Sequence, residues 1–168
     1  MRDSDVLENN PHVSRSALEA MHGQVFGWAL SRCNYEQAVA EDLVQQAYVE
    51  LLTGKARFDG ASSLKTFVFS VVQNLARSRF RRQATRLRLA GRVAAETETV
   101  EPAEPTENEA VWQAVQKLPP RQRDVVELVF CRDLTIADAA RVMGVSTGTG
   151  RTHYDRAKKA LREKLDHD

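Results

Sequence analysis

The sequence contains only two cysteines and four histidines, and neither set has the spacing of a metal site. Cys33 and Cys131 lie far apart, with no C-x-x-C pair and no histidine at a zinc-ligand distance. We expect both thiols to be buried within helical segments. No Ser/His/Asp, Cys/His or paired-carboxylate arrangement is visible either, so we expect no catalytic residues and no metal or cofactor.

Long apolar runs are also missing. No segment approaches the roughly 20 apolar residues that span a bilayer. The polar, acidic start MRDSDVLENNPHV is unlike a secretory signal. We therefore expect no membrane insertion and a cytoplasmic location. Hydrophobic residues still make up 42% of the 168 residues, which is enough to build hydrophobic cores.

Acidic residues are absent between positions 60 and 95, although the net charge of the whole chain is only +1. The basic residues of this stretch are Lys65, Arg77, Arg79, Arg81, Arg82, Arg86, Arg88 and Arg92. Such a block favours a polyanionic partner. From 93 to 110 the sign reverses, with six glutamates, Pro102 and Pro105, and no Lys or Arg. That composition is typical of a linker that cannot build a core.

The acidic stretch divides the chain into two units that both show helical periodicity, without convincing strand alternation in either. The sequence therefore predicts an all-α protein of two small helical domains joined by an acidic flexible linker. The expected boundaries are an N-terminal tail at 1–13, a first domain at 14–92, the linker at 93–106 and a second domain at 107–168.

The first unit is expected to hold three amphipathic helices. Apolar stripes mark the first two, and the third follows the turn FDGAS with Ser62 or Ser63 as its cap. One face of this third helix carries the expected core residues Leu64, Phe67, Val68, Val71, Val72 and Leu75. Its opposite face is polar and then cationic, with Phe69 and Phe80 at the margin. That face holds Thr66, Ser70, Gln73, Asn74, Arg77 and Arg81.

The second unit has the pattern of a helix-turn-helix. Pro120 suits the first position of a helix that runs on to about residue 132. A short helix follows, in which Thr135 and Asp138 have capping-box spacing, and Gly144 ends it before the last helix begins. The glycine stretch GVSTGTGR matches neither a Walker motif nor G-x-G-x-x-G, which argues against a nucleotide phosphate loop.

The outward stripe of the last helix suits the major groove of DNA, because Thr and Arg reach base edges and Lys holds phosphate. Exposed basic residues are often merely solubilising, but the helix-turn-helix context favours DNA contact. Gly150 falls on the opposite, buried stripe, where we expect it to leave space. Gly148 and Gly150 should each lower helix propensity by about 1 kcal/mol relative to Ala.

Four blocks in order resemble the extracytoplasmic-function (ECF) group of bacterial RNA polymerase sigma factors. They are AEDLVQQAYVELL, FDGASSLKTFVFSVVQNLARSRFRR, LPPRQRDVVELVF and LTIADAARVMGVSTGTGRTHYDRAKKALREKL. The resemblance extends from about Ala17 to Leu165. It implies that 14–92 is a sigma-two domain, which binds core polymerase and helps melt the promoter. It also implies that 107–168 is a sigma-four domain, which reads the minus-thirty-five element.

The resemblance also implies site residues and partners. Core polymerase would be bound through the clamp helices of its largest subunit by Asp42, Gln45, Gln46 and Val49, and also through its flap. The minus-ten element would be contacted by Phe58, Ser62, Ser63, Thr66, Phe69, Ser70, Asn74, Arg77 and Arg81. The minus-thirty-five element would be contacted by Arg151, Thr152, His153 and Arg156, which the outward stripe extends to Lys159. An anti-sigma protein is a further expected partner.

Two departures from the family pattern stand out. Phe67 occupies a position where tryptophan is frequent, which is a conservative change. Gly150 replaces a branched apolar residue, which could loosen the recognition helix. The favoured function is an alternative sigma factor that directs the polymerase without catalysis of its own. Two alternatives remain open: a sigma-like decoy that binds an anti-sigma protein without promoter activity, and an autonomous helix-turn-helix regulator.

Overall fold

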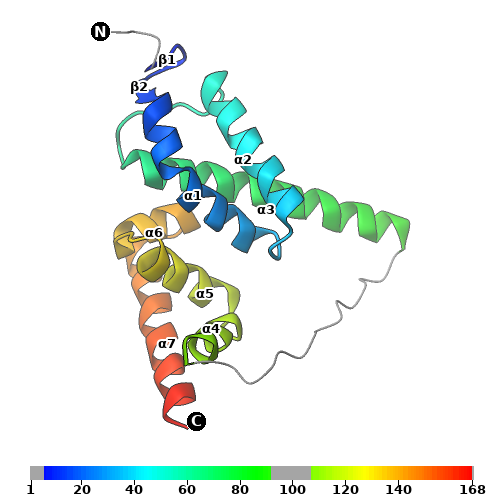
Figure 1. The fold of residues 1–168 in the computed structure, drawn as a ribbon. Coiled ribbons are helices and arrows are strands. Elements are labelled where there is room, and N and C mark those ends of the chain that lie inside the picture. The colour runs from blue at the N-terminus through cyan, green and yellow to red at the C-terminus, as the bar shows by residue number, and fades with distance from the viewer. Residues whose placement is uncertain (1–5, 92–106, 168) are drawn as a thin grey trace. The chain divides into compact units, whose positions relative to one another are not determined.

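The computed structural model describes residues 6–91 and 107–167. The acidic linker expected at 93–106 lies outside these residues. The chain divides into two compact units, Met1–Ala90 and Gly91–Asp168. Helices dominate both units, which confirms the predicted all-α fold of two small helical domains (Figure 1).

The first unit is built on helices α1 (Arg15–Arg32), α2 (Gln37–Leu52) and α3 (Leu64–Ala90). Each of the three packs against the other two. The Oγ atoms of Ser14 and Ser63 cap α1 and α3 by accepting hydrogen bonds, each of 3.1 Å, from backbone N–H groups three residues later. The core side chains include Leu18, Val25, Trp28, Leu43, Val44, Leu51, Val68, Val71, Val72 and Leu75.

Phe69 lies at the centre of this core, which corrects its predicted place beside the outward face. Its ring stacks on Trp28 with centroids 5.9 Å apart, and the Trp28 indole N–H donates to the Phe69 carbonyl oxygen. Thr66 is completely buried as well, and Gln73 nearly so. The prediction was wrong because α3 packs against both α1 and α2, so its buried arc is wider than the single stripe of a helix with one neighbour.

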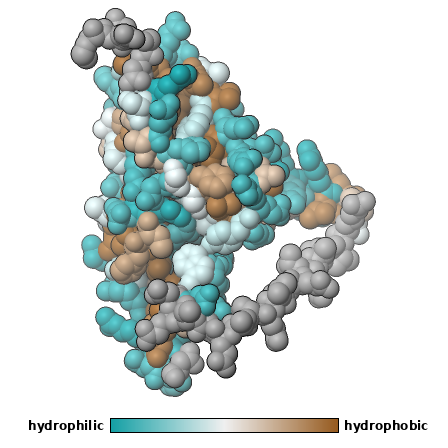
Figure 2. All heavy atoms as spheres, viewed as in Figure 1, coloured by the Kyte–Doolittle hydropathy of each residue, from teal (hydrophilic) through white to brown (hydrophobic). Residues whose placement is uncertain are grey.

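The second half of α3 extends past the other two helices of its unit (Figure 1). Every residue from 79 to 90 is exposed. The viewed surface near this end of α3 includes apolar patches (Figure 2), and Leu87 and Leu89 are among the exposed residues. Residues 79–90 of the acid-free stretch thus form a projecting helix rich in arginine.

The predicted N-terminal tail contains a β-hairpin. Strands β1 (Val6–Leu7) and β2 (Asn10–Ser14) pair antiparallel, and β2 leads directly into α1. Asn10 and Val13 are buried. No strand alternation is visible in the sequence here because the strands are short and β2 contains a proline.

The second unit contains α4 (Glu107–Gln116), α5 (Pro120–Val126), α6 (Ile136–Met143) and α7 (Thr147–Asp166). Pro120 is the first residue of α5, as predicted. The expected single helix from 120 to 132 instead continues after Val126 as a π-helix, η2 (Glu127–Cys131). The buried residues Val115, Leu118, Val126 and Ala157 form a core, with Ala160 and Leu161 packed against it.

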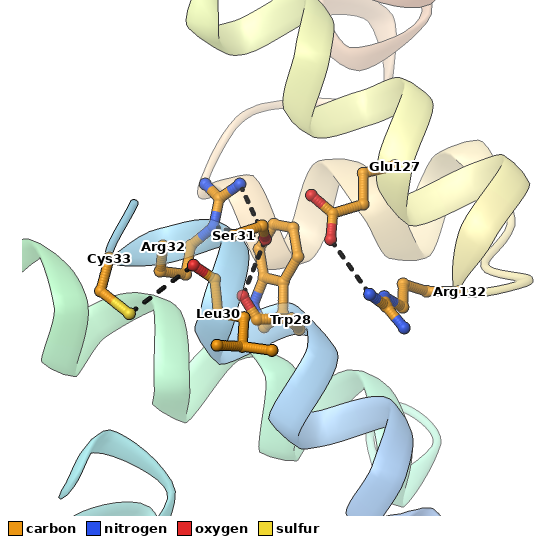
Figure 3. A network of polar contacts seen from close by, with 7 residues as sticks. All are labelled: Trp28, Leu30, Ser31, Arg32, Cys33, Glu127 and Arg132. Atoms are coloured by element: carbon orange, nitrogen blue, oxygen red, sulfur yellow. Dashed lines mark hydrogen bonds and ion pairs between the residues drawn. The ribbon is translucent and has the colours of Figure 1, made fainter. Parts of the chain in front are cut away.

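The two cysteines differ in exposure. Cys33 follows the end of α1, is half-buried, and donates through Sγ to the Ala29 carbonyl oxygen at 3.2 Å. Its Sγ also lies 3.6 Å from the Leu30 carbonyl oxygen (Figure 3). Cys131 is exposed at the end of η2, so its predicted burial was wrong. Across the same π-helical turn, the Glu127 carboxylate and Arg132 form an ion pair at 3.3 Å (Figure 3).

Candidate nucleic-acid and polymerase interfaces

The turn between α6 and α7 has the geometry of a helix-turn-helix. Thr135 caps α6 by accepting from the Asp138 N–H. Gly144 closes α6 in the left-handed conformation at φ 70°, where the lack of a β-carbon avoids strain. Ser146 caps α7 by accepting from the Thr149 N–H at 3.1 Å. A short, fully capped turn therefore fixes the start of α7 against α6.

Gly150 lies in the contact between α6 and α7 and leaves no vacancy. A β-carbon built at this position would meet the Ala140 Cβ at 2.8 Å, and the Ala140 Cα at 3.5 Å. The sequence-based expectation of space at Gly150 was therefore wrong. Its missing side chain permits the close approach of the two helices, whereas a β-carbon at Gly148 would meet nothing within 4 Å.

The predicted minus-thirty-five residues occupy the free face of α7. Arg151, Thr152, Arg156 and Lys159 are exposed, while His153 is half-buried. Thr152 donates through Oγ1 to the Gly148 carbonyl oxygen at 3.0 Å, which leaves the hydroxyl oxygen able to accept.

An aromatic pair supports the flank of α7. The Tyr154 ring stacks on Phe130 of η2 with centroids 5.9 Å apart, and the Lys158 ammonium lies 4.9 Å from the Tyr154 ring centroid. Tyr154 is itself half-buried. The π-helical turn thus supplies a ring on which α7 rests.

The predicted polymerase-binding residues share the exposed side of α2. Asp42, Gln45, Gln46 and Val49 are all exposed, and Leu52 extends the same surface. Val49 and Leu52 keep 53% and 50% of their surface accessible, which is high for apolar residues. An apolar centre beside polar and acidic groups suits a protein partner.

A groove of about 700 Å³ separates α2 and the segment that follows it from α3. We refer to it as the α2–α3 groove. Four cations, several polar groups and one aromatic ring line it. They include Gln46, Glu50, Lys55, Arg57, Phe67, Asn74, Ser78, Arg81 and Arg82. The Lys55 ammonium pairs with the Glu50 carboxylate at 3.3 Å.

A second groove of about 460 Å³ follows the other flank of α3, towards the end of α1. We refer to it as the α1–α3 groove; it is lined by Arg32, Gln73, Asn74, Ala76, Arg77, Ser78, Phe80 and Arg81. Asn74, Ser78 and Arg81 line both grooves, so they form a ridge along α3. Phe80, at 72% exposure, adds a stacking surface beside the cations.

The structure brings together only part of the predicted minus-ten set. Asn74, Arg77 and Arg81 lie along the two grooves. Phe58 packs against Phe67 with ring centroids 5.3 Å apart. Ser62 and Ser63 are accessible before α3, and the half-buried Ser70 donates to the Thr66 carbonyl oxygen. Thr66 and Phe69 cannot touch a strand on this surface because both are buried, which corrects their assignment.

Sequence reasoning missed three cations of the α2–α3 groove: Lys55, Arg57 and Arg82. Arg82 was counted in the basic block but not singled out. Lys55 and Arg57 lie before Asp59, outside the acid-free stretch. Both lie just before the predicted minus-ten loop FDGASS in the sequence, and that position could have indicated a role in the same site.

Other site types find no support in the described parts of the chain. Among residues 6–91 and 107–167, no group of three or more His, Cys, Asp or Glu side chains could hold a metal ion. No helix in these two ranges is both long and apolar enough to cross a membrane.

Comparison with known proteins identifies both units. Residues 17–86 match the family model for sigma-70 region 2, and residues 108–161 match the model for sigma-70 region 4. The ECF RNA polymerase sigma factor EcfG of Rhodopseudomonas palustris is 31% identical over 124 residues, which cover 73% of this chain and 68% of the relative. SigX of Bacillus subtilis is 28% identical over 136 residues, covering 75% and 70%.

Solved structures give the same fold. The sigma factor RpoE of Bartonella quintana, in complex with the anti-sigma factor NepR, superimposes with a TM-score of 0.73 at 24% identity. The match covers 92% of this chain and 97% of that one. CnrH, in complex with the cytosolic domain of CnrY, gives a TM-score of 0.60 at 26% identity, covering 91% and 88%. The region matches, the relatives and the fold agree, and the chain belongs to the ECF group of RNA polymerase sigma factors.

Proposed function

We propose that this alternative sigma factor divides its work between its two units. The first unit holds core polymerase through α2 and takes the minus-ten strand along α3, and the second unit reads the minus-thirty-five element through α7. The main support for this proposal comes from the projecting half of α3, where every residue from 79 to 90 is exposed and none is acidic. A helix of this kind is suited to a nucleic-acid backbone.

Polymerase binding is assigned to the exposed side of α2. Asp42, Gln45, Gln46 and Val49 are the proposed contacts, with the clamp helices of the largest subunit as their partner. Interfaces gain most from apolar groups that lose water at their centre, and Val49 and Leu52 are accessible for this. Gln46 also lines the α2–α3 groove, so the polymerase and promoter surfaces adjoin there. The polymerase flap is proposed as the partner of the second unit.

Minus-ten recognition is assigned to the grooves beside α3. A melted strand needs a cationic track and stacking surfaces. Asn74, Arg77 and Arg81 supply hydrogen bonds and charge, and Phe80 supplies an exposed ring. Phe58, Ser62 and Ser63 precede α3 and Ser70 lies in its second turn; these four are proposed as secondary contacts.

Minus-thirty-five recognition is assigned to α7. Thr152 and Arg156 face outward and are proposed to reach base edges, whereas Arg151, His153 and Lys159 are proposed to hold phosphates. The decoy alternative drew support from a loosely held recognition helix. The contact of Gly150 with Ala140 and the capped turn weaken that support.

We also propose a protein regulator for this chain. The solved relatives RpoE and CnrH were captured with NepR and with CnrY, and RpoE is named with an anti-sigma factor. The same mode of control is extended here as a proposal. Acting on polymerase and DNA places the chain in the cytoplasm, and the chemistry of RNA synthesis remains that of the polymerase.

Transcription in vitro tests this function. The full chain is added to core polymerase with a random promoter library, and transcripts are sequenced. Enrichment of templates that share two spaced elements supports the sigma factor. Binding to core polymerase without transcripts would indicate the decoy, and DNA binding that does not require polymerase would indicate the autonomous regulator.

A further inference from the structure

The chain between α2 and the predicted minus-ten loop is held by Asn10, a residue more than 40 positions away. Asn10 is 2% exposed. Its Nδ2 group donates to the Leu51 carbonyl oxygen, and also to that of Ala56 at 3.2 Å. Its Oδ1 atom accepts from the Phe58 backbone N–H at 2.9 Å. One carboxamide thus joins the hairpin to the end of α2 and to the segment beyond it.

The contacts with Ala56 and Phe58 bracket Arg57. They fix the carbonyl group before Arg57 and the N–H group after it, which restricts the backbone rotations that orient its side chain. Arg57 is exposed and lines the α2–α3 groove together with Asn74 and Arg81. Asn10 is therefore placed to determine where one cation of the groove points.

Asparagine suits this task because its side chain both donates and accepts without carrying charge. Each bond made in a buried setting also removes the cost of an unsatisfied polar group. A neighbouring contact strengthens the attachment of the hairpin without reaching Arg57: Asn9 donates to the Leu52 carbonyl oxygen at 2.7 Å. The hairpin thus makes two kinds of contact, one with α2 alone and one with the groove wall.

We propose that Asn10 is a positioning residue for promoter binding, which presents Arg57 to the phosphate backbone of the melted strand in the α2–α3 groove. This proposal rests on the proposed function. Asn10 itself touches no DNA. Its effect passes entirely through the backbone on either side of Arg57.

The salt dependence of binding gives a readout that loss of stability would not imitate. The probe is a fork-junction duplex carrying a promoter that the wild-type holoenzyme has selected from a random library. Arg57→Ala should weaken binding roughly tenfold, as for one lost charge-assisted contact. It should also lower the slope of log K against log salt by about 0.7. Asn10→Ala should reproduce both changes although it removes no charge, and Asn9→Ala should change neither.

A double-mutant cycle then tests the route of the effect. If Asn10 acts through Arg57, the Asn10→Ala and Arg57→Ala double variant binds no more weakly than the weaker single variant. Asn10→Ala combined with Arg81→Ala should instead be additive, because Arg81 belongs to α3. Additive effects of Asn10 and Arg57, or an unchanged salt slope in Asn10→Ala, would overturn the proposal.

Two further checks are made: whether each variant folds, and whether the proposed sigma-factor function itself holds. Circular dichroism and binding to core polymerase should match the wild type in every variant. If Asn10→Ala does not fold, the cycle is run on Asn10→Ser, which keeps a small polar side chain at this position and adds no charge. If the proposed function fails, no promoter is selected and Arg81→Ala has no effect. If this inference alone fails, Arg57→Ala and Arg81→Ala weaken binding while Asn10→Ala does not.

Discussion

A β-carbon at Gly150 would lie 2.8 Å from the Ala140 Cβ, closer than two such atoms approach in proteins. The two helices of the helix-turn-helix therefore make their close contact between glycine and alanine, the two smallest residue types. Gly148, two positions earlier, has open space where its side chain would be. Two glycines with the same effect on helix propensity thus have opposite roles in packing.

This contrast predicts opposite outcomes for substitution. Gly150→Val should destabilise the second unit by about 1–3 kcal/mol, because the added carbons displace α6 or α7. Gly148→Ala should stabilise α7 by up to about 1 kcal/mol, because a solvent-facing glycine loses more backbone entropy on folding than alanine. Urea unfolding of the full chain, combined with hydrogen exchange of the α7 amides, measures both.

A compensating change separates overpacking from loss of flexibility. In Gly150→Ala the added methyl group meets Ala140, and Ala140→Gly in the same chain removes the clash. The double variant should recover much of the stability lost in Gly150→Ala. If Gly150→Val were neutral or stabilising, the close contact would be refuted and the original expectation of space restored.

The sequence predicted the fold well because its signals are local. The caps at Ser63 and Thr135, the start at Pro120 and the stop at Gly144 each follow from one residue and its neighbours. The burial of Phe69 could not be read in this way. It depends on α1 covering the flank of α3, and a helical wheel does not encode how many neighbours a helix has.

The candidate site was predictable in part for the same reason. Charge and exposure along one helix are visible in sequence, so the exposed positions of α7 and the cations along α3 could be predicted. The roles of Asn10 and Arg57 arise from contacts between positions more than 40 apart. Nothing local to the hairpin indicates that Asn10 reaches the groove wall.

The exposed apolar surface of α2 predicts a selective loss of polymerase binding. Val49→Asp should weaken the affinity for core polymerase at least tenfold, about 1.4 kcal/mol, because binding would desolvate the new carboxylate. Stability should change by less than about 0.5 kcal/mol, since the site is exposed in the free chain. Fluorescence anisotropy of the labelled chain titrated with core polymerase measures the effect.

Gln37→Asp is the matched control for Val49→Asp. It places the same charge on the same helix, about 120° around the axis from Val49. Gln37 is also exposed. Equal losses in the two variants would show that general charge repulsion, and not the Val49 surface, governs binding.

Both cysteine thiols are predicted to react slowly with alkylating reagents, including Cys131, whose exposure would suggest a fast reaction. Burial raises the pKa of the Cys33 thiol. Cys131 is exposed as a residue, but its sulfur atom is partly buried, which raises the pKa of that thiol too, and the Glu127 carboxylate raises it further. A raised pKa means less thiolate at neutral pH, so both should react with iodoacetamide more slowly than free cysteine. The rates should keep increasing above the pH at which free cysteine levels off.

Denaturation provides the comparison for the thiols. In urea both cysteines should gain the reactivity of the free amino acid, because the burial that disfavours the thiolate is gone. The folded state keeps the two thiol protons to higher pH than the unfolded state. The raised pKa values therefore lower the free energy of unfolding only as the pH rises past the ordinary thiol pKa. Mass spectrometry of the alkylated peptides resolves the two sites, and equal rates in folded and unfolded chains would contradict the shift.

The outward face of α7 predicts which of its arginines reads DNA. Arg156 and Arg162 are both exposed and have the same charge, but they point about 120° apart on the helix. Because Arg156 is assigned to a base edge, Arg156→Ala should reduce holoenzyme binding to the selected promoter and lower discrimination at one position of the minus-thirty-five element by about 1–3 kcal/mol. A fall of about 0.9 in the salt slope without loss of discrimination would assign Arg156 to a phosphate instead. Arg162→Ala should leave affinity, slope and discrimination close to wild type.

Footprinting and salt titration of the two variants, on promoters with single substitutions, distinguish these outcomes. Equal losses from both variants would mean that α7 attracts DNA by its overall charge and not by its outward stripe.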